Sequence, residues 1–213
     1  MEHEFWHERW GDGRIGFHEG RPNTFLERHL AALGPARHVL VPLCGKAHDL
    51  AYLAQHGHTV LGVELSPIAA EAFFTEHGLE AERDTLGPYT RFRAGSITIL
   101  AGDFFALTPA LLAAAGGADA LYDRAALVAL PEAMRRDYVA HLRTLLGTGT
   151  PALVITFTYA QDLMEGPPFS VTPAELREHY AGADVSEVDS AMTDLGRLRQ
   201  AGGAIERCYS IRL

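Results

Sequence analysis

Short apolar runs alternate along the chain with segments in which apolar residues recur at helical spacing. Val39–Val41 and Val60–Val63 are compact runs rich in β-branched residues, and Ala152–Phe157 is a longer run of the same kind. The segments between them place apolar residues three or four positions apart, which is typical of helices with one buried face. Buried strands that alternate with helices predict a mainly parallel sheet covered by helices on both faces.

Turn and capping residues mark the limits of further elements. Ser66 and Pro67 predict a helix start, because a hydroxyl can cap a helix and proline fits its first turn. Tyr89–Phe92 and Ser96–Leu100 predict a hairpin whose second strand enters the sheet. Other expected elements are a strand at Ala118–Tyr122, helices opened by Pro131 and Pro173, and a closing strand within Ala204–Leu213.

The N-terminal segment does not fit this alternation. It is rich in charged residues and aromatic ones, among them Phe5, Trp6, Trp10 and Phe17. Two interpretations stay open: a helix packed against the sheet, or a lid over the ends of the strands. We therefore expect one domain, with an N-terminal extension over residues 1–33 and an α/β core over residues 34–213.

Composition narrows the class of protein. The 213 residues are 47% hydrophobic and 21% charged, which are values of a globular chain, and the formal net charge is -9. That negative charge argues against nucleic acid and membrane partners. The two cysteines are too few for a disulfide framework, and no cysteine or histidine cluster has zinc-site spacing, so we expect no metal. No signal peptide or membrane span is evident, which favours a cytoplasmic location.

In an open α/β sheet, ligands bind at the carboxyl ends of the strands. The first strand is followed by a turn that contains Leu43 and Gly45, and glycine there lets a ligand approach the backbone. The turn has neither the glycine spacing of a dinucleotide fingerprint nor that of a phosphate-binding loop. Glu64 ends the second strand about twenty positions further on, where an acid can accept hydrogen bonds from the ribose hydroxyls of an adenosine cofactor. The alternative is a solvated loop carboxylate.

Two more strand ends carry candidate side chains. Asp103 follows the third core strand and can receive an adenine amino group, with Phe104 as an apolar wall; the alternative is an aspartate that caps the next helix. Arg124 follows the fourth and can orient an anionic or electron-rich substrate, or it can form a salt bridge with Asp123. Each assignment is ambiguous alone, but together they predict a ligand site at successive strand ends.

These segments resemble the thiopurine S-methyltransferase family, especially its bacterial members. The VLVPLCGK and YDRAALVALP strings are long and unusual, and the matches run in order over nearly the whole chain. The matching stretches are Phe5–Trp10, Ile15–Glu19, Val39–Lys46, Gly62–Ser66, Gly102–Phe105, Tyr122–Pro131 and Glu165–Ser170.

The resemblance implies a class I methyltransferase fold, which is Rossmann-like. Its sheet would have seven mostly parallel strands, with the last one antiparallel, under an N-terminal helical lid. The cofactor would be S-adenosyl-L-methionine. Its contacts would come from Trp10 and Arg124 at the methionine part, Leu43 and Gly45 from the first turn, Glu64 at the ribose, and Asp103 with Phe104 at the adenine.

The acceptor side is also implied by the resemblance. Phe17 would line the lid, and a C-terminal arginine, Arg197 or Arg199, would face the substrate, although Gly202-Gly203 departs from the expected pattern. The resemblance implies a monomer that methylates a small aromatic or heterocyclic thiol, or selenium and tellurium compounds. Our hypothesis for the mechanism is that Arg124 is the catalytic residue, which favours the thiolate or an adjacent ring atom. Two other classes remain as alternatives: a non-catalytic adenosine-binding module and an NAD-dependent oxidoreductase.

Overall fold

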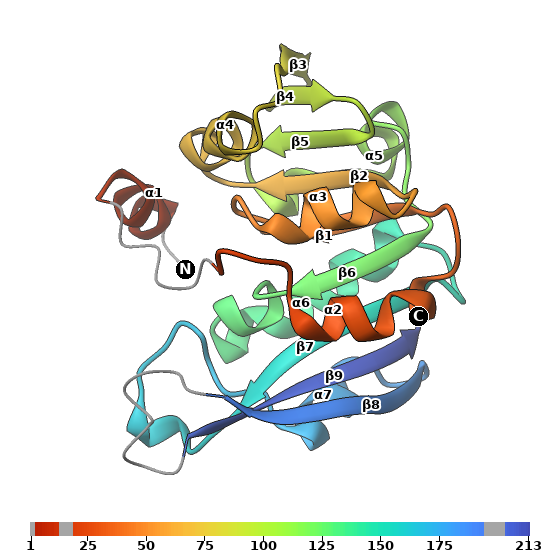
Figure 1. Cartoon of the computed structure of the whole chain (residues 1–213). Coiled ribbons are helices and arrows are strands. Elements are labelled where there is room, and N and C mark those ends of the chain that lie inside the picture. Colours follow the sequence, from red (N-terminus) through yellow and green to blue (C-terminus); the bar gives the residue numbers. More distant parts are fainter. Residues whose placement is uncertain (1–2, 13–18, 194–202) are drawn as a thin grey trace.

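The computed structural model describes residues 3–12, 19–193 and 203–213, and nine strands form one sheet in the order β3-β4-β5-β2-β1-β6-β7-β9-β8 (Figure 1). The strands are β1 (His38–Pro42), β2 (Thr59–Glu64), β3 (Glu82–Leu86), β4 (Tyr89–Ala94), β5 (Ile97–Ala101), β6 (Ala120–Arg124), β7 (Pro151–Thr158), β8 (Asp184–Thr193) and β9 (Ala204–Arg212).

The expectation of seven strands with only the last antiparallel is wrong. The central strands β5, β2, β1, β6 and β7 are parallel, as expected, but both edges of the sheet are antiparallel. β3 and β4 extend one edge because the short turns at Gly87 and Gly95, both with positive φ, fold the chain back on itself. β8 and β9 form the other edge, where β9 runs antiparallel to β7.

Helices cover both faces of the sheet, as predicted (Figure 1). Alternate residues of β1 point to opposite faces: Val39 and Val41 join one core cluster, and Leu40 joins the other. One face is covered by α2 (Thr24–His29), α3 (His48–Gln55) and α4 (Pro67–Glu76), and the other by α5 (Pro109–Ala114), α6 (Glu132–Leu145) and α7 (Pro173–His179).

Local sequence explains where these helices begin. Ser66 caps α4 by accepting a hydrogen bond from the backbone of Ala69, and Pro67 occupies the first turn, as the sequence predicted. Asn23 caps α2 in the same way through Phe25. The described residues also form short 3-10 helices, η1 (Leu30–Leu33), η2 (Phe104–Ala106), η3 (Leu127–Ala129) and η4 (Gln161–Leu163).

The N-terminal helix α1 (His3–Gly11) lies beside the edge toward which the parallel strands point, and it contacts α4 (Figure 1). Phe25, Leu26 and Leu33, by contrast, are buried against one face of the sheet, so residues 24–33 belong to the core. The lid stays a prediction for the segment before them. Among the described helices, none is long and apolar enough to cross a membrane.

Candidate active site

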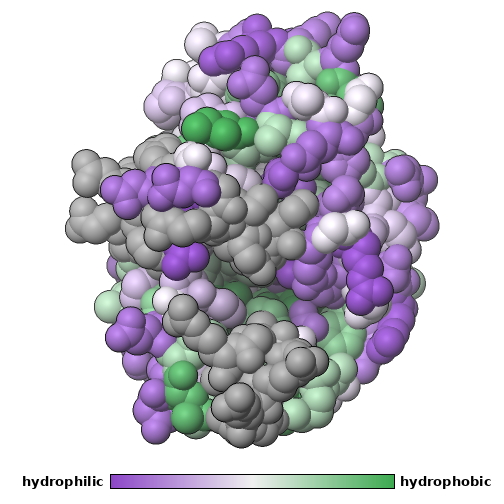
Figure 2. All heavy atoms as spheres, turned by 60° about the vertical axis from the view of Figure 1, so that its left-hand side comes forward, coloured by the Kyte–Doolittle hydropathy of each residue, from purple (hydrophilic) through white to green (hydrophobic). Residues whose placement is uncertain are grey.

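The carboxyl ends of the five parallel strands meet at one edge of the sheet, beside α1 (Figure 1). Figure 2 shows the molecule from this side, where hydrophobic residues reach the surface between groups of polar ones. Ligands of open α/β sheets collect at such an edge. The predicted residues Leu43, Gly45, Glu64, Asp103 and Arg124 all lie on its strand ends and loops.

Glu64 is buried at the end of β2, with 6% of its surface exposed, so it is not a solvated loop carboxylate. Its Oε2 accepts a hydrogen bond from the Gly45 backbone N–H at 2.8 Å, and its Oε1 accepts one from the Ser66 N–H at 2.8 Å. Burial raises the pKa of the Glu64 carboxyl to about 7, although backbone N–H groups favour its charged form. These backbone donors thus fix the Glu64 carboxylate, which can still accept further hydrogen bonds from a ligand.

The turn after β1 places its backbone against Glu64 and Trp10. Leu43 and Gly45 both have positive φ, at 47° and 53°, which turns the chain sharply out of the strand. A Cβ atom on Gly45 would lie 3.1 Å from Cζ2 of Trp10, so the indole of α1 packs directly on this glycine. Trp10 is 8% exposed. The structure therefore brings Trp10, Gly45 and Glu64 together.

The end of β5 is joined to the end of β2 by the Gly102 N–H, which donates to the Glu64 backbone carbonyl at 2.9 Å. The Asp103 side chain accepts from the Phe105 N–H at 3.0 Å, so it caps η2 as the alternative interpretation predicted. Phe104 is 4% exposed and packs against Tyr138 and His141 in the core. Its ring is thus largely enclosed by other side chains.

Arg124 ends β6 with its side chain 10% exposed, and it pairs with Glu19 rather than with Asp123. Its Nη2 lies 2.5 Å from Glu19 Oε1. Asp123 points to the other face, where it accepts hydrogen bonds from the Leu127 N–H at 3.1 Å and the Tyr138 hydroxyl at 2.8 Å. Burial raises the pKa of Asp123 to about 6. Asp123 is therefore a buried structural group, and Arg124 faces the N-terminal segment.

Several charged groups around Arg124 were not identified from the sequence. Burial lowers the pKa of the Arg124 guanidinium, but the negative charges of Glu19, Asp49 and others more than offset this, so the pKa is raised overall. Asp49 lies on α3 and is 3% exposed, and Glu206 lies on β9. An aspartate in a helix and a glutamate in a strand give no local signal, because only the fold brings them to Arg124.

The loop after β7 is bound to the loop after β6. The Phe169 N–H donates to the Val128 carbonyl at 2.6 Å, and the Tyr159 hydroxyl donates to the Pro168 carbonyl at 2.6 Å. Arg135, buried on α6, donates to the Ser170 carbonyl at 3.2 Å and pairs with Glu175. These bonds hold residues 165–170, one of the stretches that match the family, beside the loop that follows β6.

Other predicted site residues lie outside the described part of the chain. These are Phe17, Arg197 and Arg199. Over residues 3–12, 19–193 and 203–213, no group of three or more histidine, cysteine, aspartate and glutamate side chains could hold a metal ion. Both cysteines, Cys44 and Cys208, are free and buried.

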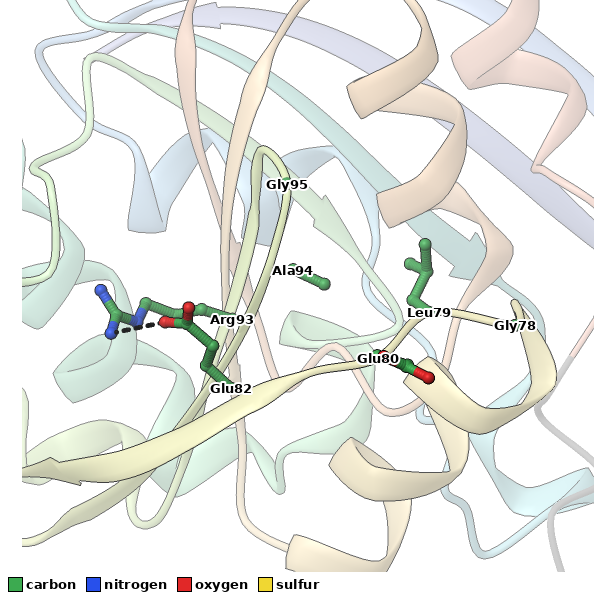
Figure 3. A pocket seen from close by; sticks show the side chains of 7 residues that line it. All are labelled: Gly78, Leu79, Glu80, Glu82, Arg93, Ala94 and Gly95. Carbon is green, nitrogen blue, oxygen red and sulfur yellow. Dashed lines mark hydrogen bonds and ion pairs between the residues drawn. The ribbon is translucent and has the colours of Figure 1, made fainter.

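A separate surface hollow of about 480 Å³ lies beside the β3–β4 hairpin (Figure 3). The ion pair between Arg93 and Glu82, 3.1 Å long, lies on one side of it, and Leu79 lies on the other. Ala94, which lines it, pairs with Ile97 at the start of β5. The hollow is therefore at the amino end of the parallel strands and is not part of the candidate site.

A family model described as Thiopurine S-methyltransferase matches residues 1–207. The chain belongs to this family. A thiopurine S-methyltransferase of Pseudomonas putida is 46% identical over 217 residues and covers 99% of each chain. The enzyme of the same name from Xanthobacter autotrophicus is 50% identical over 214 residues, covering 98% of each chain. The chain is thus a methyltransferase, and neither an oxidoreductase nor a non-catalytic module is favoured.

Solved structures support the fold. A 1,6-didemethyltoxoflavin-N1-methyltransferase of Burkholderia thailandensis superposes with a TM-score of 0.66 at 20% identity, covering 99% of this chain and 86% of that one. The magnesium protoporphyrin IX methyltransferase of Synechocystis gives a TM-score of 0.66 at 15% identity and covers all of both chains. Both were solved with bound S-adenosylhomocysteine. At these identities the likeness establishes the class I methyltransferase fold.

Proposed function

We propose that this thiopurine S-methyltransferase family member transfers a methyl group from S-adenosylmethionine to the sulfur of a small aromatic or heterocyclic thiol. Selenium and tellurium compounds are a second acceptor class. The observation that carries the cofactor assignment is the buried Glu64 carboxyl, held by the Gly45 and Ser66 backbone N–H groups at the carboxyl edge of the sheet. A carboxylate has about four acceptor sites, so backbone donors leave acceptor capacity on Glu64 for the ribose hydroxyls.

The remaining contacts are proposed from the same edge. Trp10, packed on Gly45, closes the methionine side, and Leu43 completes the first turn. Asp103 lies at the adenine side, where its cap of η2 fixes the position of its carboxylate. Because the Phe104 ring is largely buried, its backbone is the part that faces the cofactor.

When bound, S-adenosylmethionine supplies a methyl group that its positively charged sulfur activates for transfer. The protein has to align the acceptor sulfur with that methyl group and exclude water. Arg124 stabilises the thiolate, or an adjacent electron-rich ring atom, through its charge and its N–H donors. Trp10 and Phe17 close the site, and Arg199 or Arg197 contacts the acceptor from the C-terminal segment.

A methyl-transfer assay tests the proposal. Wild-type protein is incubated with S-adenosylmethionine and a panel of aromatic and heterocyclic thiols, with selenite and tellurite added to the panel. We expect methylated products, and Arg124→Ala to lower kcat/KM by roughly 100-fold, as for loss of an oriented charged donor. Arg136→Ala is the matched control, since the Arg136 side chain on α6 is 81% exposed. An unchanged kcat/KM for Arg124→Ala removes this residue from the mechanism.

A further inference from the structure

Asn23 connects three elements that meet beside Arg124. It is 2% exposed and lies just before α2. Its backbone N–H donates to Asp49 Oδ1 on α3 at 2.7 Å, and its side-chain Nδ2 donates to Glu206 Oε1 on β9 at 3.1 Å. Its Oδ1 accepts from the Phe25 N–H at 2.9 Å and so caps α2. We call Asn23, Asp49 and Glu206 the Asn23 clasp.

The two carboxyl groups of the clasp act on Arg124. Burial raises the pKa of Asp49, and the charge of Arg124 is the next largest influence, acting in the opposite direction. Burial also raises the pKa of Glu206, while the hydrogen bond from Asn23 and the charge of Arg124 oppose this. Glu19, four positions before Asn23, holds Arg124 by a direct ion pair. Glu19 thus binds Arg124 directly, and the charges of Asp49 and Glu206 add to the negative charge around it.

Helix capping alone does not require this arrangement. Serine or threonine in place of Asn23 caps a helix as well, without any link to β9. Burying carboxyl groups is costly, and apolar residues of similar volume are often equally stable or more so. A neutral amide that donates to Glu206 while the adjoining backbone donates to Asp49 satisfies both groups without adding charge. These features indicate that the hydrogen bonds of Asn23 serve to position the groups around Arg124.

We propose that Asn23 is a positioning residue. Its hydrogen bonds to Asp49 and Glu206 fix where the segment that carries Glu19 meets the sheet, and the Glu19 ion pair in turn fixes the direction of the Arg124 guanidinium. The inference rests on the proposed function, in which Arg124 acts on the acceptor. Asn23 itself does not touch the acceptor. Its loss impairs turnover of the acceptor, whereas the adenosine part of the cofactor, held by Glu64, stays bound.

Exchanging the donor and the acceptor of the hydrogen bond between Asn23 and Glu206 tests whether this bond positions Arg124. Asn23→Asp keeps the size of the side chain and its capping oxygen, but it places a carboxylate opposite Glu206. Adding Glu206→Gln to this variant restores a donor on the other side, so that the hydrogen bond is reversed and the total charge equals that of the wild type. Thr108→Ala is the matched control, since Thr108 caps α5, a helix of six residues like α2.

We expect Asn23→Asp to lower kcat for the thiol acceptor by roughly tenfold or more, as for a lost hydrogen bond to a charged group. Asn23→Asp displaces Arg124 without removing its charge and leaves Glu64 unchanged, so the dissociation constant of S-adenosylmethionine, measured by calorimetry, changes by less than about threefold. The double variant recovers to within about threefold of the wild-type kcat, and Thr108→Ala keeps that kcat. Amide hydrogen exchange over residues 19–25 accelerates in Asn23→Asp and slows again in the double variant.

Two results would overturn the proposal: a kcat for Asn23→Asp no lower than that of Thr108→Ala, or a double variant as impaired as the single one. Absence of methyl transfer by the wild type would instead count against the proposed function. In that case hydrogen exchange still decides whether the partner exchange restores the clasp, and equal exchange in the two variants refutes the link.

Discussion

Replacing Gly45 by alanine tests whether the contact between the first turn and Trp10 supports cofactor binding. Gly45 has φ 53°, a left-handed conformation that costs an alanine about 1–2 kcal/mol. The added Cβ would lie 3.1 Å from Cζ2 and 3.4 Å from Cη2 of Trp10. The first of these contacts is tighter than an ordinary van der Waals distance, so the indole has to shift slightly away from the turn.

Gly57→Ala is the matched control for this substitution. Gly57 follows α3, has φ 85° and leaves nothing within 4 Å of an added Cβ. Alanine therefore meets the same backbone cost there without touching another side chain. We expect both variants to lose about 1–2 kcal/mol of unfolding free energy, which corresponds to a fall in melting temperature of about 2–8 °C.

Cofactor binding separates the two variants. Calorimetry with S-adenosylmethionine is expected to give Gly57→Ala an affinity within about twofold of the wild type, and Gly45→Ala one weaker by roughly tenfold, equivalent to about 1.4 kcal/mol. The physical reason is that the Gly45 N–H also orients Glu64, so a shift of the turn disturbs both the indole and the carboxylate. Equal affinities for the two variants would refute this account of the turn.

Three further outcomes follow from buried groups. Cofactor affinity should rise as the pH passes upward through about 7, since the ionised Glu64 accepts the ribose hydroxyls. If titration calorimetry finds the same affinity across this pH range, the prediction is contradicted. Folding raises the pKa of Glu64, so the folded state favours the protonated carboxyl. The stability that this provides is fully present below roughly pH 4.3 and is lost as the pH rises through about 7. The melting temperature of Glu64→Gln should lack this pH dependence. Tyr138→Phe removes a donor to buried Asp123 and should cost about 1–3 kcal/mol in urea unfolding, whereas a loss near zero would mean that Asp123 needs no such partner.

The core of the fold could be predicted because its strands are apolar on both faces. Val39–Val41, Val60–Val63 and Ala152–Phe157 lie inside β1, β2 and β7, where burial leaves a continuous apolar signal. The edges carry no such signal. β3 has the sequence ERDTL and is almost wholly exposed, and β8 is exposed at most positions and has no apolar run. Edge strands owe their position to pairing with a neighbour, so composition alone did not reveal them.

The candidate site was predictable where a residue follows a strand. Leu43, Gly45, Glu64, Asp103 and Arg124 lie at strand ends because the parallel topology collects those ends at one edge. The groups that surround Arg124 come instead from a helix, a distant strand and the segment before α2. The hydrogen bond between Asn23 and Glu206 joins residues 183 positions apart. Neither spacing nor composition encodes such a pairing.

Calorimetric titration of S-adenosylmethionine into the wild type and Glu64→Gln tests the central claim most directly, with S-adenosylhomocysteine as the product-side ligand. The account predicts saturable binding of both ligands to the wild type and affinity at least roughly tenfold weaker for Glu64→Gln, as for loss of charged acceptors. Melting curves establish that the variant is folded. No binding by the wild type, or equal affinity for a folded Glu64→Gln, would contradict a cofactor held at the end of β2.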